Sequence, residues 1–222
     1  MTKHRLLFSK TGRAKYLSHL DLMRTIQRVF ARAGVAVRHT EGFNPHAYVS
    51  VALPLSVGVE SVCELLDFAL VDDTPLADLP ALLTPNMPEG IAVLDAYEAE
   101  TKLKDITFLR VRGVLTYDAI ENTMDMAAKL TAFFAQKSIL VKKLTKKKTE
   151  TEVDIIPLIR EIAFTAEGAH QVQMEAVIAA QNPGLNPSLL IEALRQHIPE
   201  LVPDFVAFSR VMVYTKDMQV FR

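Results

Sequence analysis

Side chains that could transfer protons gather in the first 46 residues of this 222-residue chain. They are Tyr16, His19 and His46. Histidine titrates near neutral pH, so two histidines and a tyrosine could carry out general acid–base chemistry on a ribose hydroxyl. The competing interpretation is that each histidine, His39 included, is a structural residue. The catalytic candidates are therefore His19, His46 and Tyr16.

The first 46 residues do not support a hydrolase triad or a metal site. Ser18, His19 and Asp21 have the residue types of a hydrolase triad, but triad members converge from separate parts of a fold. Ser18 instead predicts a helix N-cap, with Asp21 as its partner three residues later. The histidines lack the spacing of metal ligands. Because there is also no glycine-rich phosphate loop or dinucleotide fingerprint, we expect no metal and no cofactor.

Positive charge is concentrated near the start of the chain. Residues 1–46 hold nine Lys/Arg and two acids, whereas residues 47–105 hold two Lys/Arg and eleven acids. Arg24, Arg28 and Arg32 recur every four residues, which puts them on one side of a helix. The planar guanidinium grips two phosphate oxygens at once, so RNA is the partner that we expect. The alternatives are a solvated helix face, and pairing of the basic segment with the acidic one.

A loop and a lysine cluster extend this prediction. In Gly42–His46, Phe43 could stack on a base and Asn44 could read a base edge, although Phe43 could instead anchor the core. The lysines at 142–148 could form a phosphate-binding arm, or an exposed hairpin whose charges prevent edge pairing. The predicted RNA- or anion-binding residues are Lys10, Arg13, Lys15, His19, Arg24, Arg28, Arg32, Phe43, Asn44, His46, Lys146, Lys147 and Lys148.

The elements that must position these residues follow from apolar periodicity and chain breakers. The helix over 18–33 is predicted to end at Gly34 and to have an apolar face of Leu20, Met23, Ile26 or Gln27, and Phe30. The first half is expected to have strands at 5–10, 35–39, 47–53, 62–71 and 91–94 and helices at 18–33 and 74–83. The second half is expected to have strands at 107–116, 138–142, 171–178 and 205–213, helices at 117–135 and 186–197, a helical turn at 153–162, and an insertion near 143–168.

Both halves follow the β-α-β-β-α-β order, the first with one extra strand. We therefore predict an α+β protein with two ferredoxin-like (split βαβ) halves, each an antiparallel sheet with helices on one face. The halves are residues 1–98 and 106–222, joined by a charged linker at 98–105. The single cysteine, Cys63, excludes a disulfide within the chain. With no signal peptide and no apolar run of transmembrane length, we expect a cytoplasmic protein.

Several motifs together resemble the radical SAM-linked family. They are Lys10–Gly12, Tyr16–Arg24 with Arg28, Glu41–His46, Pro54, Gly58 with Glu60 and Ser61, Pro85–Ile91, and Asp154–Pro157. The resemblance spans nearly the whole chain. This family is a bacterial domain of unknown function found beside or fused to radical SAM proteins. The resemblance implies an accessory or substrate-presenting subunit with a radical SAM protein as its partner. The chain lacks the three-cysteine cluster motif of the enzyme itself.

Three functions are therefore open. We expect an accessory protein that binds RNA or another anionic partner and works with a radical SAM enzyme. The first alternative is a metal-independent RNA-processing enzyme that uses His19, His46 and Tyr16. At the level of the fold, the first half also resembles ferredoxin-like CRISPR RNA-processing proteins. The second alternative is a protein-interaction module that binds no nucleic acid.

Overall fold

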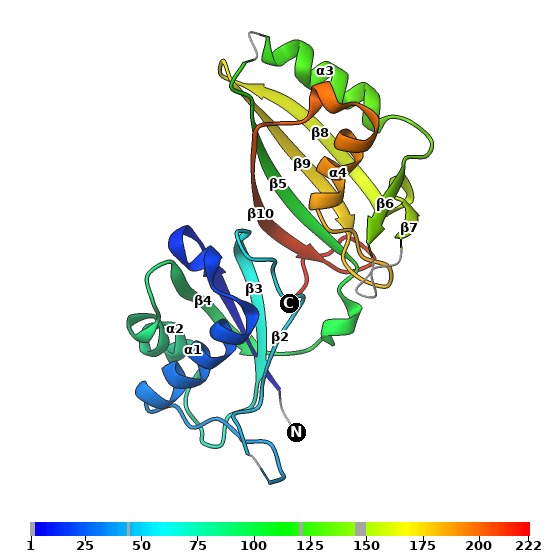
Figure 1. Cartoon of the computed structure of the whole chain (residues 1–222). Helices are drawn as coiled ribbons and strands as arrows, with labels where there is room; N and C mark the ends of the chain where they lie inside the picture. The colour runs from blue at the N-terminus through cyan, green and yellow to red at the C-terminus, as the bar shows by residue number, and fades with distance from the viewer. Residues whose placement is uncertain (1–2, 44, 120–121, 145–149) are drawn as a thin grey trace. The chain divides into compact units, whose positions relative to one another are not determined.

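The computed structural model describes residues 3–43, 45–119, 122–144 and 150–222. The chain divides into two compact units (Figure 1). The N-terminal unit consists of Met1–Asp105 together with Phe221–Arg222, and the C-terminal unit is Ile106–Val220. The last two residues thus belong to the unit in which the chain begins. In the part of the chain that is described, no helix is long and apolar enough to cross a membrane.

The N-terminal unit is a four-stranded antiparallel sheet with helices on one face (Figure 1). Its strands lie in the order β4-β1-β3-β2, which is the arrangement that the β-α-β-β-α-β order predicts. The strands are β1 (His4–Lys10), β2 (Val49–Val51), β3 (Glu60–Phe68) and β4 (Ile91–Glu98), and the α-helices are α1 (His19–Arg32) and α2 (Leu79–Leu83). Short 3₁₀ helices are η1 (Gly12–Tyr16), η2 (Leu76–Asp78), η3 (Thr84–Asn86) and η4 (Leu103–Asp105).

Helix α1 begins and ends where the sequence predicts. The Ser18 hydroxyl accepts the Asp21 backbone N–H at 3.2 Å and donates to the Asp21 carboxylate at 2.7 Å. The two residues therefore form a helix cap, and they need no catalytic role to explain them. The buried face is Leu22, Ile26, Val29 and Phe30. The prediction that Leu20 belongs to this face is wrong, because Leu20 is 64% exposed.

The strand predicted over 35–39 does not form. Val37 and His39 make only isolated bridges, to Leu70 and Ala47 respectively. The edge strand β2 is correspondingly short, since it pairs with β3 from Val49 to Val51 only. The N-terminal unit therefore has the four-stranded arrangement without the extra strand.

The C-terminal unit repeats the same arrangement. Its sheet has the order β10-β5-β9-β8, with α3 and α4 on one face (Figure 1). The strands are β5 (Phe108–Thr116), β8 (Ile159–Glu167), β9 (Gln171–Ala179) and β10 (Phe205–Tyr214), and the helices are α3 (Thr123–Phe134) and α4 (Ser188–His197). A hairpin of β6 (Leu140–Leu144) and β7 (Glu150–Asp154) is inserted after α3, and η5 (Ile156–Leu158) and η6 (Pro199–Leu201) are 3₁₀ helices. The predicted α+β fold with two ferredoxin-like halves is confirmed.

Two details of the C-terminal unit differ from the prediction. The second strand of its sheet is β8 rather than residues 138–142, which belong to the inserted hairpin. Helix α3 begins later than predicted, because Asn122 is its cap and accepts the Asp125 backbone N–H at 3.1 Å. Tyr117, the predicted start, is buried and donates its hydroxyl to the Leu201 carbonyl. Burial raises the pKa of the Tyr117 hydroxyl, so it remains a hydrogen-bond donor at physiological pH.

Asp154 fixes the chain where the inserted hairpin ends, which predicts a pH dependence. Its carboxylate accepts the backbone N–H groups of Ile139 and Ile156, each at 3.1 Å. The Ile139 N–H above all, helped by a hydrogen bond from Ser138, lowers the pKa of Asp154, although burial opposes this shift. The unfolded chain therefore takes up a proton at higher pH than the folded chain does. The stabilisation is complete above the ordinary aspartate pKa of about 4 and is lost as the pH falls through the lower folded value.

Asp154→Asn should remove this contribution. We expect the melting temperature of the variant to fall less steeply than that of the natural protein between about pH 5 and pH 3. Differential scanning calorimetry across this range measures the effect, with Asp217→Asn as a control at a carboxylate of the same unit. Parallel pH profiles of the Asp154 variant and the natural protein would contradict the prediction.

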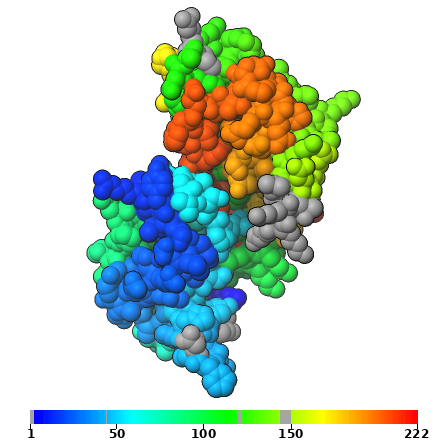
Figure 2. Space-filling view, in the orientation of Figure 1, coloured from blue at the N-terminus to red at the C-terminus, as the bar shows by residue number. Residues whose placement is uncertain are grey.

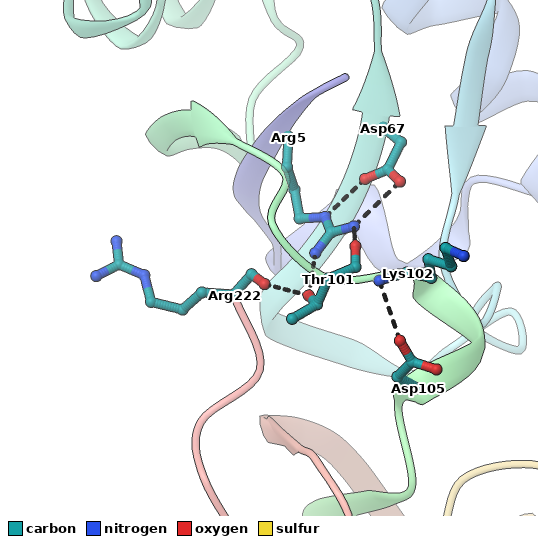
Figure 3. Close-up of polar contacts among 6 residues, drawn as sticks. All are labelled: Arg5, Asp67, Thr101, Lys102, Asp105 and Arg222. Carbon is teal, nitrogen blue, oxygen red and sulfur yellow. Dashed lines mark hydrogen bonds and ion pairs between the residues drawn. The ribbon is translucent and has the colours of Figure 1, made fainter. Parts of the chain in front are cut away.

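An ion pair is buried in the N-terminal sheet (Figure 3). Arg5 on β1 is fully buried and makes a bidentate contact with Asp67 on β3, with its Nε and Nη2 at 2.6 and 3.1 Å from the two carboxylate oxygens. The same guanidinium donates to the Thr101 hydroxyl at 3.1 Å and the Thr101 carbonyl at 2.9 Å. The Phe221 ring lies over it, 4.8 Å from ring centroid to Cζ, and Thr101 also donates to the Arg222 carbonyl. The sheet, the segment after β4 and the end of the chain thus meet at one side chain.

Candidate nucleic-acid interface

Helix α1 carries the arginine stripe, which consists of Arg24, Arg28 and Arg32, and all three are exposed. Arg24 contacts Asp21 at 3.5 Å, and Arg32 donates to the Asn86 carbonyl at 2.8 Å. Among the described residues, the Arg28 guanidinium has no hydrogen-bond or ion-pair partner. Because the buried face of α1 packs on the sheet, the fold holds these guanidinium groups toward solvent. Arg24 and Arg32 are thus held only by an ion pair and a hydrogen bond at the surface.

In the described parts of the chain, no acidic residue of segment 47–105 forms an ion pair with the arginine stripe. Arg5 pairs with Asp67, and Lys15 pairs with Glu60 at 3.3 Å. Neither pair uses an arginine of α1. The Arg24–Asp21 pair lies within the helix, with side chains 66% and 56% exposed. Such exposed pairs contribute about 0–1 kcal/mol, so an incoming phosphate can replace the carboxylate.

The residues before α1 differ in their accessibility. Lys10 is only 2% exposed, and its ammonium donates to the Lys15 carbonyl at 3.1 Å. It therefore does not belong to the predicted binding surface, because a lysine at the end of a central strand lies in the interior of the sheet. Arg13 is exposed. Lys15 is half-buried, held by Glu60, and its ammonium lies 5.5 Å from the Tyr16 ring centroid.

The loop after α1 adds an aromatic side chain to the surface. Phe43 is fully exposed, so the interpretation of Phe43 as a core anchor is wrong. His46 is exposed and its Nδ1 lies 3.1 Å from the Thr40 hydroxyl. Figure 2 shows α1 and residues 38–43, both in shades of blue, on the same visible face of the N-terminal unit. Asn44 and Lys146, Lys147 and Lys148 lie outside the described residues.

The two candidate catalytic histidines lie at opposite ends of the sheet. The register of β1 with β3 runs from Lys10–Ser61 at one end to His4–Phe68 at the other. Tyr16 and His19 follow Lys15, whose carbonyl accepts the Gly58 N–H at the first end. His46 lies beyond the second end, because the following strand pairs Val49 with Phe68.

From Ser61 to Phe68 strand β3 advances by seven residues, or about 23 Å at ~3.3 Å per residue. One substrate position cannot contact both histidines across that distance. The structure therefore does not bring His19, His46 and Tyr16 together as a proton-transfer site. Among the described residues no group of three His, Cys, Asp or Glu side chains could hold a metal ion. What the geometry offers is an extended surface with positive charge along a helix.

Sequence reasoning missed Arg5 and Asp67. A signal was present, because Arg5 directly precedes an apolar run in one strand and Asp67 lies between apolar residues in another, and the two strands were expected to belong to one sheet. Opposite charges in such positions indicate a buried pair. This pair supports the sheet under α1 and is not itself exposed.

The structure thus describes a protein of two ferredoxin-like units, of which the N-terminal one carries an exposed basic helix. The chain belongs to the family described as "Uncharacterized protein conserved in bacteria (DUF2344)", which matches residues 3–187. No curated protein matches the chain.

Solved structures resemble this chain at low sequence identity. A chain of the "Crystal Structure of a Cbf5-Nop10-Gar1 Complex" is 10% identical over 95% of this chain, with a TM-score of 0.51. This chain spans 48% of the length of that one, and the likeness concerns the fold alone. An unknown protein from Galdieria sulphuraria is 10% identical over 95% of this chain and 98% of its own, and a putative glycine cleavage system transcriptional repressor is 12% identical over 94% and 98%. Both have a TM-score of 0.26.

Proposed function

We propose that this protein binds RNA through the N-terminal unit and acts as an accessory protein of a radical SAM enzyme. The exposed arginine stripe of α1 carries the proposal. Its guanidinium groups have the geometry for bidentate contacts with phosphate. Among the described residues, Arg24 and Arg32 make only exposed contacts and Arg28 makes no hydrogen bond or ion pair. The charge balance of +7 in residues 1–46 (nine basic minus two acidic residues) supports an anionic partner.

The sequence resemblance described above supports the second part of the proposal. A protein that presents RNA needs an extended surface and no reaction centre of its own, which agrees with the separation of His19 from His46. The single cysteine means that the chain does not itself supply the three cysteines that ligate a radical SAM cluster. The partner enzyme would supply that chemistry.

Charge reversal on α1 tests RNA binding. We expect Arg24→Glu with Arg28→Glu to weaken binding of a labelled RNA of about 12 nucleotides at least tenfold at about 50 mM salt, because two phosphate contacts become repulsive. Fluorescence anisotropy measures the affinity. The matched control is Lys129→Glu with Lys137→Glu, which makes the same change in charge at exposed lysines of the C-terminal unit and should leave the affinity within about twofold.

The salt dependence gives a second measurement. Replacing the same arginines with glutamine should reduce the slope of log affinity against log salt by about 1.4, or about 0.7 for each lost contact with a single strand. Equal affinities and slopes for the natural protein and the Arg24/Arg28 variants would refute RNA binding by this surface. In that case a pull-down of the radical SAM enzyme that survives nuclease treatment would identify the surface as a protein-interaction site instead.

A further inference from the structure

Exposed aromatic side chains flank the arginine stripe. Tyr16 is 65% exposed at the end of η1, just before α1, and Phe43 is fully exposed in the loop after α1. Phe8, Phe30 and Phe68, by contrast, are almost completely buried in the core of the same unit. Leaving two large rings in water forfeits the main stabilisation that aromatic residues give a fold. Stability of the unit therefore does not account for these two positions.

The positions of the two rings follow from the course of the chain. Tyr16 precedes the first turn of α1, at the end of the sheet where Lys10 pairs with Ser61. Phe43 belongs to the loop that returns from α1 to β2, at the end of the sheet where Val49 pairs with Phe68. Helix α1 has 14 residues and is about 21 Å long at 1.5 Å per residue. The arginine stripe thus runs along the helix from one aromatic ring toward the other.

A lysine and a leucine beside the Tyr16 ring add positive charge and apolar surface to this end of α1. The Lys15 ammonium lies over the Tyr16 ring at 5.5 Å from its centroid, and Glu60 holds that ammonium in place. The ring is nevertheless largely exposed. Leu20, which lies one helical step before Arg24 in the same four-residue repeat, is also exposed. An apolar, aromatic start is therefore followed directly by positive charge.

We propose that this surface selects single-stranded RNA, with unpaired bases stacked on Tyr16 and Phe43 and the phosphates between them on the arginine stripe. The inference rests on the proposed function and makes it more specific. Bases in a duplex are stacked on one another and cannot offer a face to a side chain, whereas those of a single strand can. At a stacked rise of about 3.4 Å per nucleotide, α1 would span about six nucleotides.

Comparison of single and double strands tests this inference. The probes are a labelled RNA of about 12 nucleotides of mixed sequence and the same RNA annealed to its complement, measured by fluorescence anisotropy at about 50 mM salt. We expect the single strand to bind at least tenfold more tightly than the duplex. Tyr16→Ala and Phe43→Ala should each weaken single-strand binding about tenfold and change duplex binding less than twofold. Tyr16→Phe and Phe43→Tyr, which keep the ring, should retain the affinity.

A matched control separates stacking from a general effect of removing an exposed ring. Phe205 is 63% exposed at the start of β10 in the C-terminal unit, and Phe205→Ala should leave both affinities unchanged. Equal binding of single strand and duplex, or no loss in the Tyr16 and Phe43 variants, would overturn selection by stacking. If the Arg24/Arg28 variants still lost affinity in that case, RNA binding by charge would stand alone. Absence of binding to both probes would overturn the inference and RNA binding together.

Discussion

Arg5→Ala is expected to lower the free energy of unfolding by about 3–5 kcal/mol, because it leaves the Asp67 carboxylate buried without its counter-charge. The same change removes the donors to the Thr101 hydroxyl and carbonyl and the cation under the Phe221 ring. Urea unfolding followed by circular dichroism measures the loss. With two units in the chain, the transition of the N-terminal unit is followed separately by hydrogen exchange of β1 and β3 amides.

Two further variants test whether burial of the ion pair causes the large loss of stability expected for Arg5→Ala. Arg112 pairs with Glu175 across neighbouring strands at 2.9 Å, but their side chains are 46% and 40% exposed. Arg112→Ala should therefore cost less than about 1 kcal/mol. Arg5→Met with Asp67→Leu removes both charges and should cost less than Arg5→Ala alone, since no uncompensated carboxylate remains. A loss at Arg5 no larger than that at Arg112 would mean that the buried pair is not a stability determinant.

The fold could be predicted because local signals agreed with the global arrangement. Both halves were predicted to have the β-α-β-β-α-β order, which has one usual sheet arrangement, although residues 138–142 were predicted as the strand that β8 supplies in the second half. Ser18 with Asp21 marked the start of α1, and its end before Gly34 was also predicted. Both signals are local, so no partner elsewhere in the chain was needed to interpret them.

The errors in the predicted strands arose where pairing with a neighbouring strand decides whether a strand forms. Residues 35–39 have the β-branched residues of a strand, but Val37 and His39 find only single bridges there. Strand β8 was not predicted: its first residues were assigned to the helical turn at 153–162 and the rest to the insertion near 143–168. It is an edge strand in which no residue is fully buried, so it lacks a continuous apolar run. The residues of the predicted turn that directly precede β8, Ile156–Leu158, do form a 3₁₀ helix.

In the candidate site, too, the exposure of single side chains depends on partners that are distant in the sequence. The four-residue repeat of arginines could place the stripe on α1, but not decide whether acids from elsewhere would cover it. Lys10 and Lys15 have the same residue type and lie five residues apart, yet one is buried and the other pairs with Glu60. Phe43 is apolar and is nevertheless fully exposed. Sequence gives the residue type, whereas burial depends on neighbours that are distant in the chain.

Gly90→Ala is expected to destabilise the N-terminal unit by roughly 2–5 kcal/mol, for two reasons that add. Gly90 has φ +89°, which L-residues rarely adopt, and a Cβ there would lie 2.3 Å from the Thr11 carbonyl oxygen and 3.1 Å from the Ala14 Cβ. The Gly90 carbonyl accepts the Thr11 N–H at 2.8 Å, so the two backbones cannot separate without losing this bond. Urea unfolding measures the cost.

Gly58→Ala is the matched control for this substitution. Gly58 also has φ +89°, but a Cβ there would meet no other heavy atom within 4 Å. Its cost should therefore be only the backbone term of about 1–2 kcal/mol. Equal losses at the two glycines would show that the contact with Thr11 is relieved by a small shift. If the difference is found, Gly90→Ala should also weaken RNA binding in the protein that remains folded, because Thr11 and Ala14 fix the η1 helix that presents Tyr16, whereas Gly58→Ala should weaken it less.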